Sequence, residues 1–285
     1  MPFQRVNDPK QLKLIANSIR QDLIRMLAEA KSGHTAGPLD LADFFSALYF
    51  NIMNHDPKNP GWVSRDRFVL SCGHVCPVQY AAMAEAGYFP KEELMTLRKL
   101  GTRLHGHPHN KALPGIETSS GPLGQGSSIA VGMALAAKME RKKHYIYCLT
   151  SDGEHDEGQV WEAWMFACKM RLSNLIIFMD RNFIQIDGNT EDVLPLEPLA
   201  EKLKSFNLNV ISVNGHDIPA IIKAVEQAKK SDKPSMILLN TVPGKGISFI
   251  EGKYQWHGKP PSQEEAQMAI KELEAQKERI LAGKE

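Results

Sequence analysis

Two polar segments, each following an apolar run, contain side chains able to bind a metal ion and an anion. Asp152 and Gly153 come shortly after the run YIYCLT, and Asn182 comes shortly after NLIIFMD. In open parallel sheets, ligands bind at the carboxyl ends of the strands, where the loops converge. If these runs form neighbouring strands, we expect the Asp152 carboxylate, the Asn182 amide oxygen and the Ile184 backbone carbonyl to lie together.

This set of oxygen atoms predicts a divalent cation that also binds a diphosphate. Mg²⁺ and Ca²⁺ prefer oxygen ligands and complete their shells with water and substrate phosphate where the protein supplies few ligands. Gly153 lets the backbone approach the anion, and a helix expected from about Glu157 directs free amide groups toward it. Taken alone, however, these two residues favour a simpler interpretation, in which Asp-Gly is a turn and Asn182 is a loop or helix-stop residue.

The segments that would position these residues alternate between helical and extended patterns. Apolar runs predict strands at residues 67–71, 145–150, 174–180, 208–213 and 234–240. Helical spacing predicts helices at 12–30, 39–50, 77–86, after Pro90, and at 126–139, 157–171, 197–205, 217–230 and 262–285. Apolar strands alternating with helices indicate an α/β, doubly wound, mostly parallel sheet with helices on both faces. We expect residues 1–285 to form one domain with long, functional N-terminal loops and a C-terminal helix.

The composition gives no indication of a nucleic-acid or membrane partner. The 285 residues have a formal net charge of +1, with 42% hydrophobic and 24% charged residues. This balance is typical of a globular protein and offers no basic surface for a polyanion. No apolar run reaches the roughly 20 residues of a membrane helix, and the first residues lack a signal-peptide pattern. We therefore expect a cytoplasmic protein.

Cysteine and histidine spacing raises the alternative of a transition-metal site. Cys72 and Cys76 flank His74, but a structural zinc site needs four ligands and no second cluster has suitable spacing. The segment HGHPH at residues 105–109 could also supply imidazoles, although residues two apart in a proline-containing loop define no coordination geometry. Histidine is also the side chain that best moves protons near pH 7, which sugar chemistry requires.

The order of the motifs resembles transketolase. SDGEHDEGQVWEA followed by DRNFIQIDG resembles the thiamine diphosphate motif, in which Gly-Asp-Gly precedes an Asn by some 25 to 30 residues. The segments SGHTAGPLD, RDRFVLSCGH, GHPHN, GIETSSGPLGQG, NGHD and WHGKP also occur in the transketolase order. The resemblance covers nearly the whole chain, with Ser151 in place of the usual first glycine. It implies thiamine diphosphate and Mg²⁺ or Ca²⁺ as cofactors.

The resemblance also implies roles for individual residues. His34 and His257 would flank the substrate hydroxyl that loses its proton, and His107 would hold hydroxyls of the transferred fragment. The residues implied in cofactor binding are His74, Gly121, Leu123, Asp152, Gly153, Glu157, Asn182 and His257, and the metal ligands are Asp152, Asn182 and Ile184. Glu157 and Glu162 would join a network between active sites, or would simply be acids in the first turns of a helix. His105 and His109 receive no role.

By the same resemblance, a pyrimidine-binding domain and its activating glutamate are expected on a second polypeptide. The chain would be the N-terminal subunit of a split transketolase, with two copies of each subunit, and inactive alone. The activity would transfer a two-carbon ketol unit from a ketose or ketose phosphate to an aldose or aldose phosphate, as in the pentose phosphate pathway. The alternatives are a subunit of a deoxyxylulose phosphate synthase-like or 2-oxoacid-decarboxylating enzyme, and a non-catalytic scaffold subunit.

Overall fold

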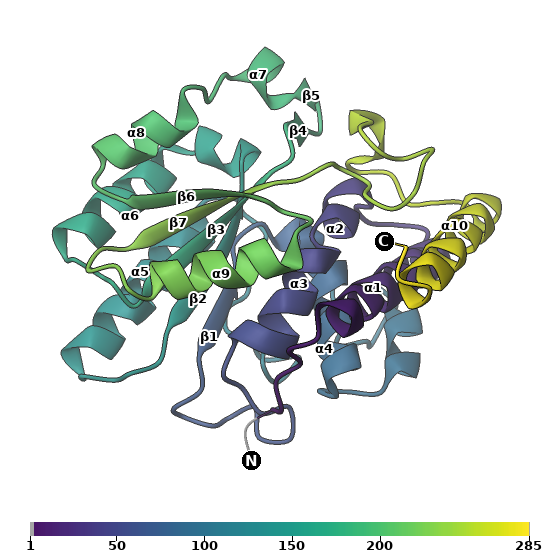
Figure 1. Ribbon diagram of the computed structural model, residues 1–285, viewed down its shortest axis with the longest axis horizontal. Helices are drawn as coiled ribbons and strands as arrows, with labels where there is room; N and C mark the ends of the chain where they lie inside the picture. The colour runs from purple at the N-terminus through teal and green to yellow at the C-terminus, as the bar shows by residue number, and fades with distance from the viewer. Residues whose placement is uncertain (1–2, 285) are drawn as a thin grey trace.

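A computed structural model describes residues 3–284, and a five-stranded sheet lies at its centre (Figure 1). The strands are β1 (Arg67–Leu70), β2 (Ile146–Ser151), β3 (Leu175–Arg181), β6 (Asn209–Asn214) and β7 (Ser235–Asn240). They lie in the order β1-β2-β3-β7-β6, and every pairing is parallel. A separate antiparallel hairpin contains β4 (Ile184–Gln185) and β5 (Gly188–Asn189). The predicted α/β fold with a parallel sheet is confirmed.

The helices surround this sheet largely where helical spacing predicts them. They are α1 (Pro9–Ala30), α2 (Ala36–Asp40), α3 (Ala42–Ala47), α4 (Cys76–Ala86), α5 (Gln125–Met139), α6 (Gly158–Lys169), α7 (Thr190–Val193), α8 (Leu199–Ser205), α9 (Ile218–Ala228) and α10 (Gln263–Leu281). Shorter helical turns are Leu48–Ile52, Gly73–Val75, Lys91–Thr96, Gly153–Asp156 and Tyr254–Trp256.

Three predicted helices differ from the observed elements. The helix predicted over residues 39–50 is divided among α2, α3 and a π-helical turn. The segment after Pro90 is a 3-10 helix that ends before Arg98, whose left-handed backbone (φ 61°) cannot continue a helix. Helix α8 starts later than expected because Pro198 precedes it in an extended conformation. Helical spacing locates apolar faces but does not resolve such local breaks.

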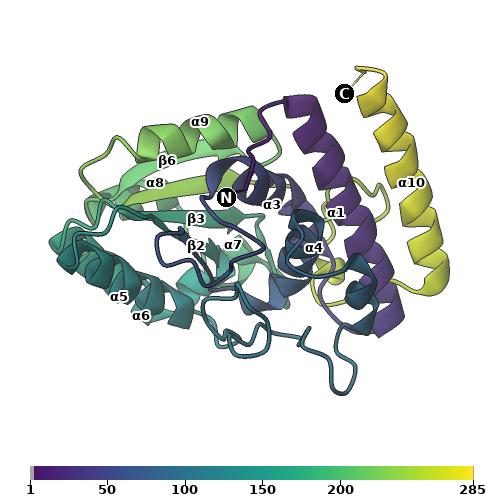
Figure 2. The ribbon, with the colours of Figure 1, turned by 90° about the horizontal axis from the view of Figure 1, so that it is seen from below.

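Alternate residues of the strands face two separate cores. Tyr147, Leu149, Ile176 and Phe178 pack toward the layer that contains α1, α3, α4 and α9. Ile146, Cys148, Ile177 and Met179 pack toward α5, α6 and α8. Figure 2 shows α9 and the α5–α6 pair on opposite sides of the sheet. Since the strand side chains are buried on both faces, these strands read as continuous apolar runs in the sequence.

The carboxyl ends of all five strands lie at one edge of the sheet, because every pairing is parallel. Helix α5 precedes β2 and α6 follows it on one face, whereas α9 covers the other face because the chain returns from β6 at the edge to β7. Parallel crossovers of constant hand require this change of face when the direction of winding reverses. The loops after β1, β2, β3 and β7 therefore start from the same carboxyl edge.

The two terminal helices pack against each other beside the sheet (Figure 2). Helix α10 starts with the predicted capping box, in which the Glu265 amide donates to the Ser262 hydroxyl and the Ser262 amide donates to the Glu265 carboxylate. Within residues 3–284, no helix is both long and apolar enough to cross a bilayer.

Candidate functional site

A cavity of about 300 Å³ opens at the carboxyl edge of the sheet. It receives residues from segments that are distant in sequence. Its lining consists of His34, Gly37, His74, Val75, His107, Gly121, Leu123, Ser151, Gly153, Asp180, Asn182, Ile184, Gln185, Ile186 and His257. Most of the residues predicted for the site are therefore brought to one place.

Three of the predicted residues do not line this cavity. Asp152 lies beneath the surface, with 1% of its area exposed, and adjoins the site through Gly153, whose amide donates to its carboxylate. Glu157 is exposed at the N-cap of α6, and Glu162 is exposed on the same helix. His105 and His109, for which we expected no role, pair with each other at a ring distance of 5.5 Å.

Three imidazoles form a cluster on one wall of the cavity. The ring centres of His34 and His74 are 4.9 Å apart, those of His34 and His257 are 5.3 Å apart, and those of His74 and His257 are 5.4 Å apart. Burial, with smaller effects from His257, Arg98 and His107, lowers the pKa of His34 to about 4. Burial also lowers the pKa of His74 and of His257. The cluster is therefore neutral at pH 7 and can both donate and accept hydrogen bonds.

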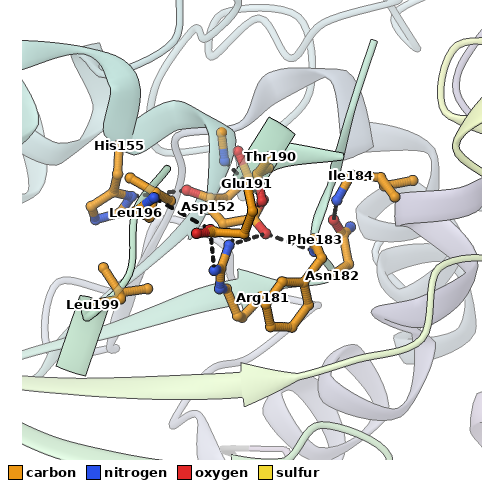
Figure 3. Close-up of polar contacts among 12 residues, drawn as sticks. Asp152, His155, Arg181, Asn182, Phe183, Ile184, Thr190, Glu191, Leu196 and Leu199 are labelled. Carbon is orange, nitrogen blue, oxygen red and sulfur yellow. Dashed lines mark hydrogen bonds and ion pairs between the residues drawn. The ribbon is translucent and has the colours of Figure 1, made fainter. Parts of the chain in front are cut away.

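The Asp152 carboxylate is held by three donors at the end of β2 (Figure 3). Its Oδ1 atom accepts from the Gly153 amide at 2.8 Å. Its Oδ2 atom accepts from the Phe183 amide at 2.8 Å and from Nη1 of Arg181 at 3.2 Å. Burial raises the pKa of Asp152 to about 6, although Arg181 and the two amides oppose the shift. The group is thus ionised at neutral pH.

The Asn182 amide is oriented by two buried carboxylates. Its Nδ2 atom donates to Asp40 at 3.1 Å and to Asp180 at 2.8 Å. Since both N–H groups are occupied in this way, the amide oxygen is directed away from the carboxylates, where the Ile184 amide donates to it at 3.1 Å. Burial raises the pKa of Asp40 and of Asp180 well above the ordinary range.

Asp40 and Asp180 were not among the expected residues. Asp180 ends the apolar run two positions before Asn182, so its place at the strand end was visible in the sequence. Asp40 lies 142 positions before Asn182, and no local pattern relates the two. It reaches the site only because α2 packs near the carboxyl edge of the sheet.

The oxygen atoms at this edge fit a divalent cation. Oδ1 of Asp152 accepts from the Gly153 amide and Oδ1 of Asn182 accepts from the Ile184 amide, and each such oxygen has a second acceptor position. Within residues 3–284, no group of three or more His, Cys, Asp or Glu side chains could hold a metal ion. A cation here would therefore need amide or backbone oxygens in addition to carboxylate oxygens, which is a donor set typical of Mg²⁺ or Ca²⁺.

The two cysteines near His74 belong to the packed interior. Cys72 and Cys76 are both buried, and their thiols donate to backbone carbonyls, that of Cys76 to Gly106 at 3.2 Å. Burial raises the pKa of Cys76 to about 12. Both side chains are thus protonated thiols in contact with the loops, rather than thiolates facing the cavity.

Glu154 connects the loops on either side of the cavity, and the sequence pattern did not single it out. Its buried carboxylate accepts from the Ser71 hydroxyl, from the Gly124 amide and from the Ser151 amide. Gly73 also requires close contact here, because a Cβ atom at this position would lie 2.8 Å from Oγ of Ser120. The segment containing Gly121 and Leu123 is consequently held against the ends of β1 and β2.

Comparison with known proteins gives consistent matches along the chain. Residues 11–280 match the family model described as transketolase, thiamine diphosphate binding domain. The chain is 49% identical over 260 residues to the 6-deoxy-6-sulfo-D-fructose transketolase subunit SqwG of Clostridium sp. (strain MSTE9), covering 91% of this chain and 94% of that protein. It is 39% identical over 264 residues to an apulose-4-phosphate transketolase subunit of Actinobacillus succinogenes, covering 92% of this chain and 96% of that protein.

Solved structures show the same fold. The crystal structure of transketolase from Campylobacter jejuni superposes with a TM-score of 0.88 at 36% sequence identity. The match covers 96% of this chain and 46% of that chain. The present chain thus corresponds to less than half of that solved protein.

Proposed function

We propose that this chain, which belongs to the transketolase family, is the diphosphate-binding subunit of an enzyme that transfers a two-carbon ketol unit between sugars. The observation that carries the proposal is that three neutral imidazoles share one cavity with Asn182 and with Gly153, whose amide donates to the Asp152 carboxylate. A site for diphosphate alone has no need of imidazoles, and a scaffold has no need of either feature.

The family supports thiamine diphosphate as the cofactor, and we propose Mg²⁺, with Ca²⁺ as the alternative, as the metal. Asp152, Asn182 and the carbonyl of Ile184 would hold the metal, and Gly153 would lie against the diphosphate. Thiamine diphosphate, when bound, supplies the nucleophilic carbon and the electron sink that make cleavage of the carbon-carbon bond feasible. His74, Gly121 and Leu123 would contact it within the cavity, whereas exposed Glu157 would act at the boundary with a partner.

The histidines would bind the substrate hydroxyls and transfer their protons. The Nδ1 atoms of His34 and His257 are buried and have no hydrogen-bond partner within residues 3–284. Since burial keeps both rings neutral, the two histidines together can hold the hydroxyl next to the bond that breaks, accept its proton and return it to the product. His107 is exposed at the mouth of the cavity and would hold hydroxyls of the transferred fragment.

We further propose that a second polypeptide completes the active site. The support is the match to two proteins named as transketolase subunits, over 94% and 96% of their lengths. The partner would supply a pyrimidine-binding domain, the glutamate that activates the cofactor, and residues that bind the anionic end of the sugar. An assembly with two copies of each chain would place Glu157 and Glu162 between active sites.

The donor sugar is proposed to be a ketose with an anionic terminal group. A relative with 49% identity is named for 6-deoxy-6-sulfo-D-fructose, which favours a sulfonate as a second candidate beside the phosphate of ordinary sugar phosphates. Assays with 6-deoxy-6-sulfo-D-fructose and with fructose 6-phosphate, each with the same aldose acceptor, separate the two candidates. Release of CO₂ from pyruvate by the same preparation would instead favour the decarboxylating alternative.

The proposal is tested with the complex recovered from the cells that produce it, supplied with thiamine diphosphate and Mg²⁺. We expect ketol transfer by the complex and none by this chain alone. Replacing His34 or His257 by Ala should lower kcat by about 100-fold or more, because a positioned proton acceptor contributes roughly 10² to 10⁴. His105→Ala is the matched control, and ketol transfer by neither donor, or unchanged kcat in His34→Ala, would reject the proposed roles.

A further inference from the structure

Arg181 is a buried cation directly beside the proposed metal ligand Asn182. It ends β3, and 2% of its surface is exposed. Buried guanidinium groups need acceptors, since an unpaired donor or charge in the interior is costly. Its four terminal N–H groups are directed to four different side chains: Asp152 at 3.2 Å, Thr190 at 3.0 Å, Glu191 at 2.6 Å and Glu197 at 2.9 Å. Figure 3 shows the guanidinium beside Asp152, Thr190 and Glu191. One side chain thus joins the end of β2 to residues 190–197.

Residues 183–197, which we call the covering segment, take part in the cavity but have few apolar anchors. Ile184 and Ile186 line the cavity, yet Ile186, Val193 and Leu194 expose 44% to 60% of their surface. In Figure 1 the hairpin β4–β5 and α7 lie beyond the carboxyl ends of the central strands. A segment with little buried apolar area opens readily, so polar contacts decide how firmly it is held.

The contacts of Arg181 also determine the position of the Asp152 carboxylate. The Oδ2 atom of Asp152 accepts from both Arg181 and the Phe183 amide, while the guanidinium lies 3.9 Å from the centre of the Phe183 ring. The Thr190 amide in turn donates to the Phe183 carbonyl at 3.0 Å. With Oδ2 engaged in this way, Oδ1 is the oxygen left beside Gly153, which lines the cavity.

Loss of Arg181 would change both the net charge near the proposed metal site and the positions of the neighbouring groups, and these two changes have opposite effects on cation binding. The guanidinium faces three carboxylates, so its removal adds net negative charge near a bound cation and, by charge alone, strengthens cation binding. By position, its removal frees Asp152 and the covering segment and weakens binding. Lysine keeps the charge but cannot reproduce four divergent hydrogen bonds.

We infer that Arg181 is a positioning residue that fastens the covering segment to the metal-binding carboxylate, so that retention of the metal and diphosphate depends on its hydrogen bonds. The inference has two parts. The first, that Arg181 fastens the covering segment, concerns this chain alone, because the guanidinium and its four acceptors all lie within residues 152–197. The second, that metal retention depends on Arg181, deepens the proposed function and rests on it.

Hydrogen-deuterium exchange of the complex tests whether Arg181 fastens the covering segment. In Arg181→Lys we expect backbone amides of the covering segment to exchange at least about tenfold faster, the size expected when a hydrogen bond to a charged group is lost. Arg20→Lys is the matched control, since Arg20 is equally buried and binds Asp43 and the Leu39 carbonyl away from this segment. Unchanged exchange of the covering segment in Arg181→Lys would overturn the inference.

A second variant tests the same inference in case Arg181→Lys does not fold. The double change Glu191→Gln and Glu197→Gln keeps the buried pair of Arg181 and Asp152 and removes the charges of the outer acceptors, which are partly exposed. These two side chains also accept from the amides of residues 196, 197 and 199, and Gln keeps an oxygen for such a bond. We expect faster exchange of the covering segment here as well. Exchange equal to wild type in the double variant would also overturn the inference.

The dependence of metal retention on Arg181 is tested by calorimetry. The measured quantity is the Mg²⁺ concentration that gives half-maximal binding of thiamine diphosphate to the complex. We expect this concentration to rise at least about tenfold in Arg181→Lys. Equal or tighter binding in Arg181→Lys would overturn the positioning role. Absence of binding by the wild-type complex would instead reject the proposed cofactor site, and the exchange experiment would still decide whether Arg181 fastens the segment.

Discussion

Asp152 and the cavity histidines respond to burial in opposite directions. Loss of water disfavours the charged form of each group, so the pKa of Asp152 rises to about 6 while that of His34 falls to about 4. Arg181 and two backbone amides keep the Asp152 shift from becoming larger. At pH 7 the neutral imidazoles of the cavity therefore lie near an anionic carboxylate, the combination that the proposed chemistry requires.

Replacing Asp152 by Asn should remove the charge that attracts the metal. We expect the Mg²⁺ concentration needed for thiamine diphosphate binding to rise by about tenfold or more, because the affinity of an oxygen site for a divalent cation depends on the charge of its ligands. Isothermal calorimetry on the complex measures this change. Asp187→Asn, at an exposed position of the hairpin loop, is the control, and equal Mg²⁺ dependence in the two variants would contradict the metal assignment.

Because His155 is buried, we expect the protein to lose stability in mild acid. Its Nδ1 atom donates to the Ser151 carbonyl and its Nε2 atom accepts from the Trp164 indole, so the ring is neutral with the proton on Nδ1. Burial lowers the folded-state pKa of His155 to about 4, below the ordinary 6.5. Between these values the unfolded state binds more protons, so the free energy of unfolding falls as pH decreases from about 6.5 to about 4.

Replacing His155 by Gln isolates this contribution. The variant should be less stable at pH 7 but lose stability less steeply between pH 6 and pH 4.5, by about 1 kcal/mol per pH unit. Urea unfolding at several pH values measures both slopes, and the comparison cancels the similar contributions of His34 and His74. Parallel slopes for wild type and variant would show that His155 is not buried as a neutral group.

At the scale of elements, the site depends on contacts between the ends of strands and the starts of helices. Glu154 joins Ser71 after β1, Ser151 at the end of β2 and Gly124 at the N-cap of α5. A carboxylate has enough acceptor positions for all three donors, whereas a carboxamide has one oxygen and adds donors of its own. The cavity wall near Leu123 is thus held by a charge in the interior rather than by packing alone.

Replacing Glu154 by Gln should therefore destabilise the fold. We expect the free energy of unfolding to fall by about 1 to 3 kcal/mol, the cost of leaving a buried donor unpaired. Denaturant unfolding of the purified chain measures this change, with Glu162→Gln on the exposed face of α6 as the control. Equal stability of the two variants would mean that Glu154 is not the link between these elements.

At the scale of the whole molecule, one surface is suited to a protein partner. Helices α5 and α6 lie side by side (Figure 2). They expose Ile129, Met165 and Phe166, and the N-cap of α6 is Glu157. Exposed apolar side chains on neighbouring helices are typical of interaction surfaces. A partner placed here would also cover the acids expected between active sites.

The affinity-tagged chain recovered from its own cells should accordingly carry a second polypeptide. We expect native mass spectrometry to show an assembly with two copies of each chain, and Met165→Asp together with Phe166→Asp to reduce recovery of the partner by about tenfold, because burying a charge opposes association. A Met268→Asp variant, at an exposed position of α10, is the control. Recovery of this chain in isolation would contradict the proposed assembly.

Several features of this protein were determined by its sequence alone. Apolar runs bounded by polar residues located all five sheet strands, because residues buried on both faces leave a continuous signal. Asp152 and Asn182 could be assigned to strand ends, and hence to one edge, because parallel strands point the same way. The capping box of α10 was also visible, since both of its partners lie within four residues.

The tertiary structure decided which distant side chains meet. The cluster of His34, His74 and His257, the pairing of Asp40 with Asn182 and the four acceptors of Arg181 depend on how loops pack after the strands are aligned. Local periodicity reports which face of an element is buried, but it carries no information about the partner that buries it. Burial itself then set the neutral state of the imidazoles, because the pKa of a side chain depends on the water it loses when the whole chain folds.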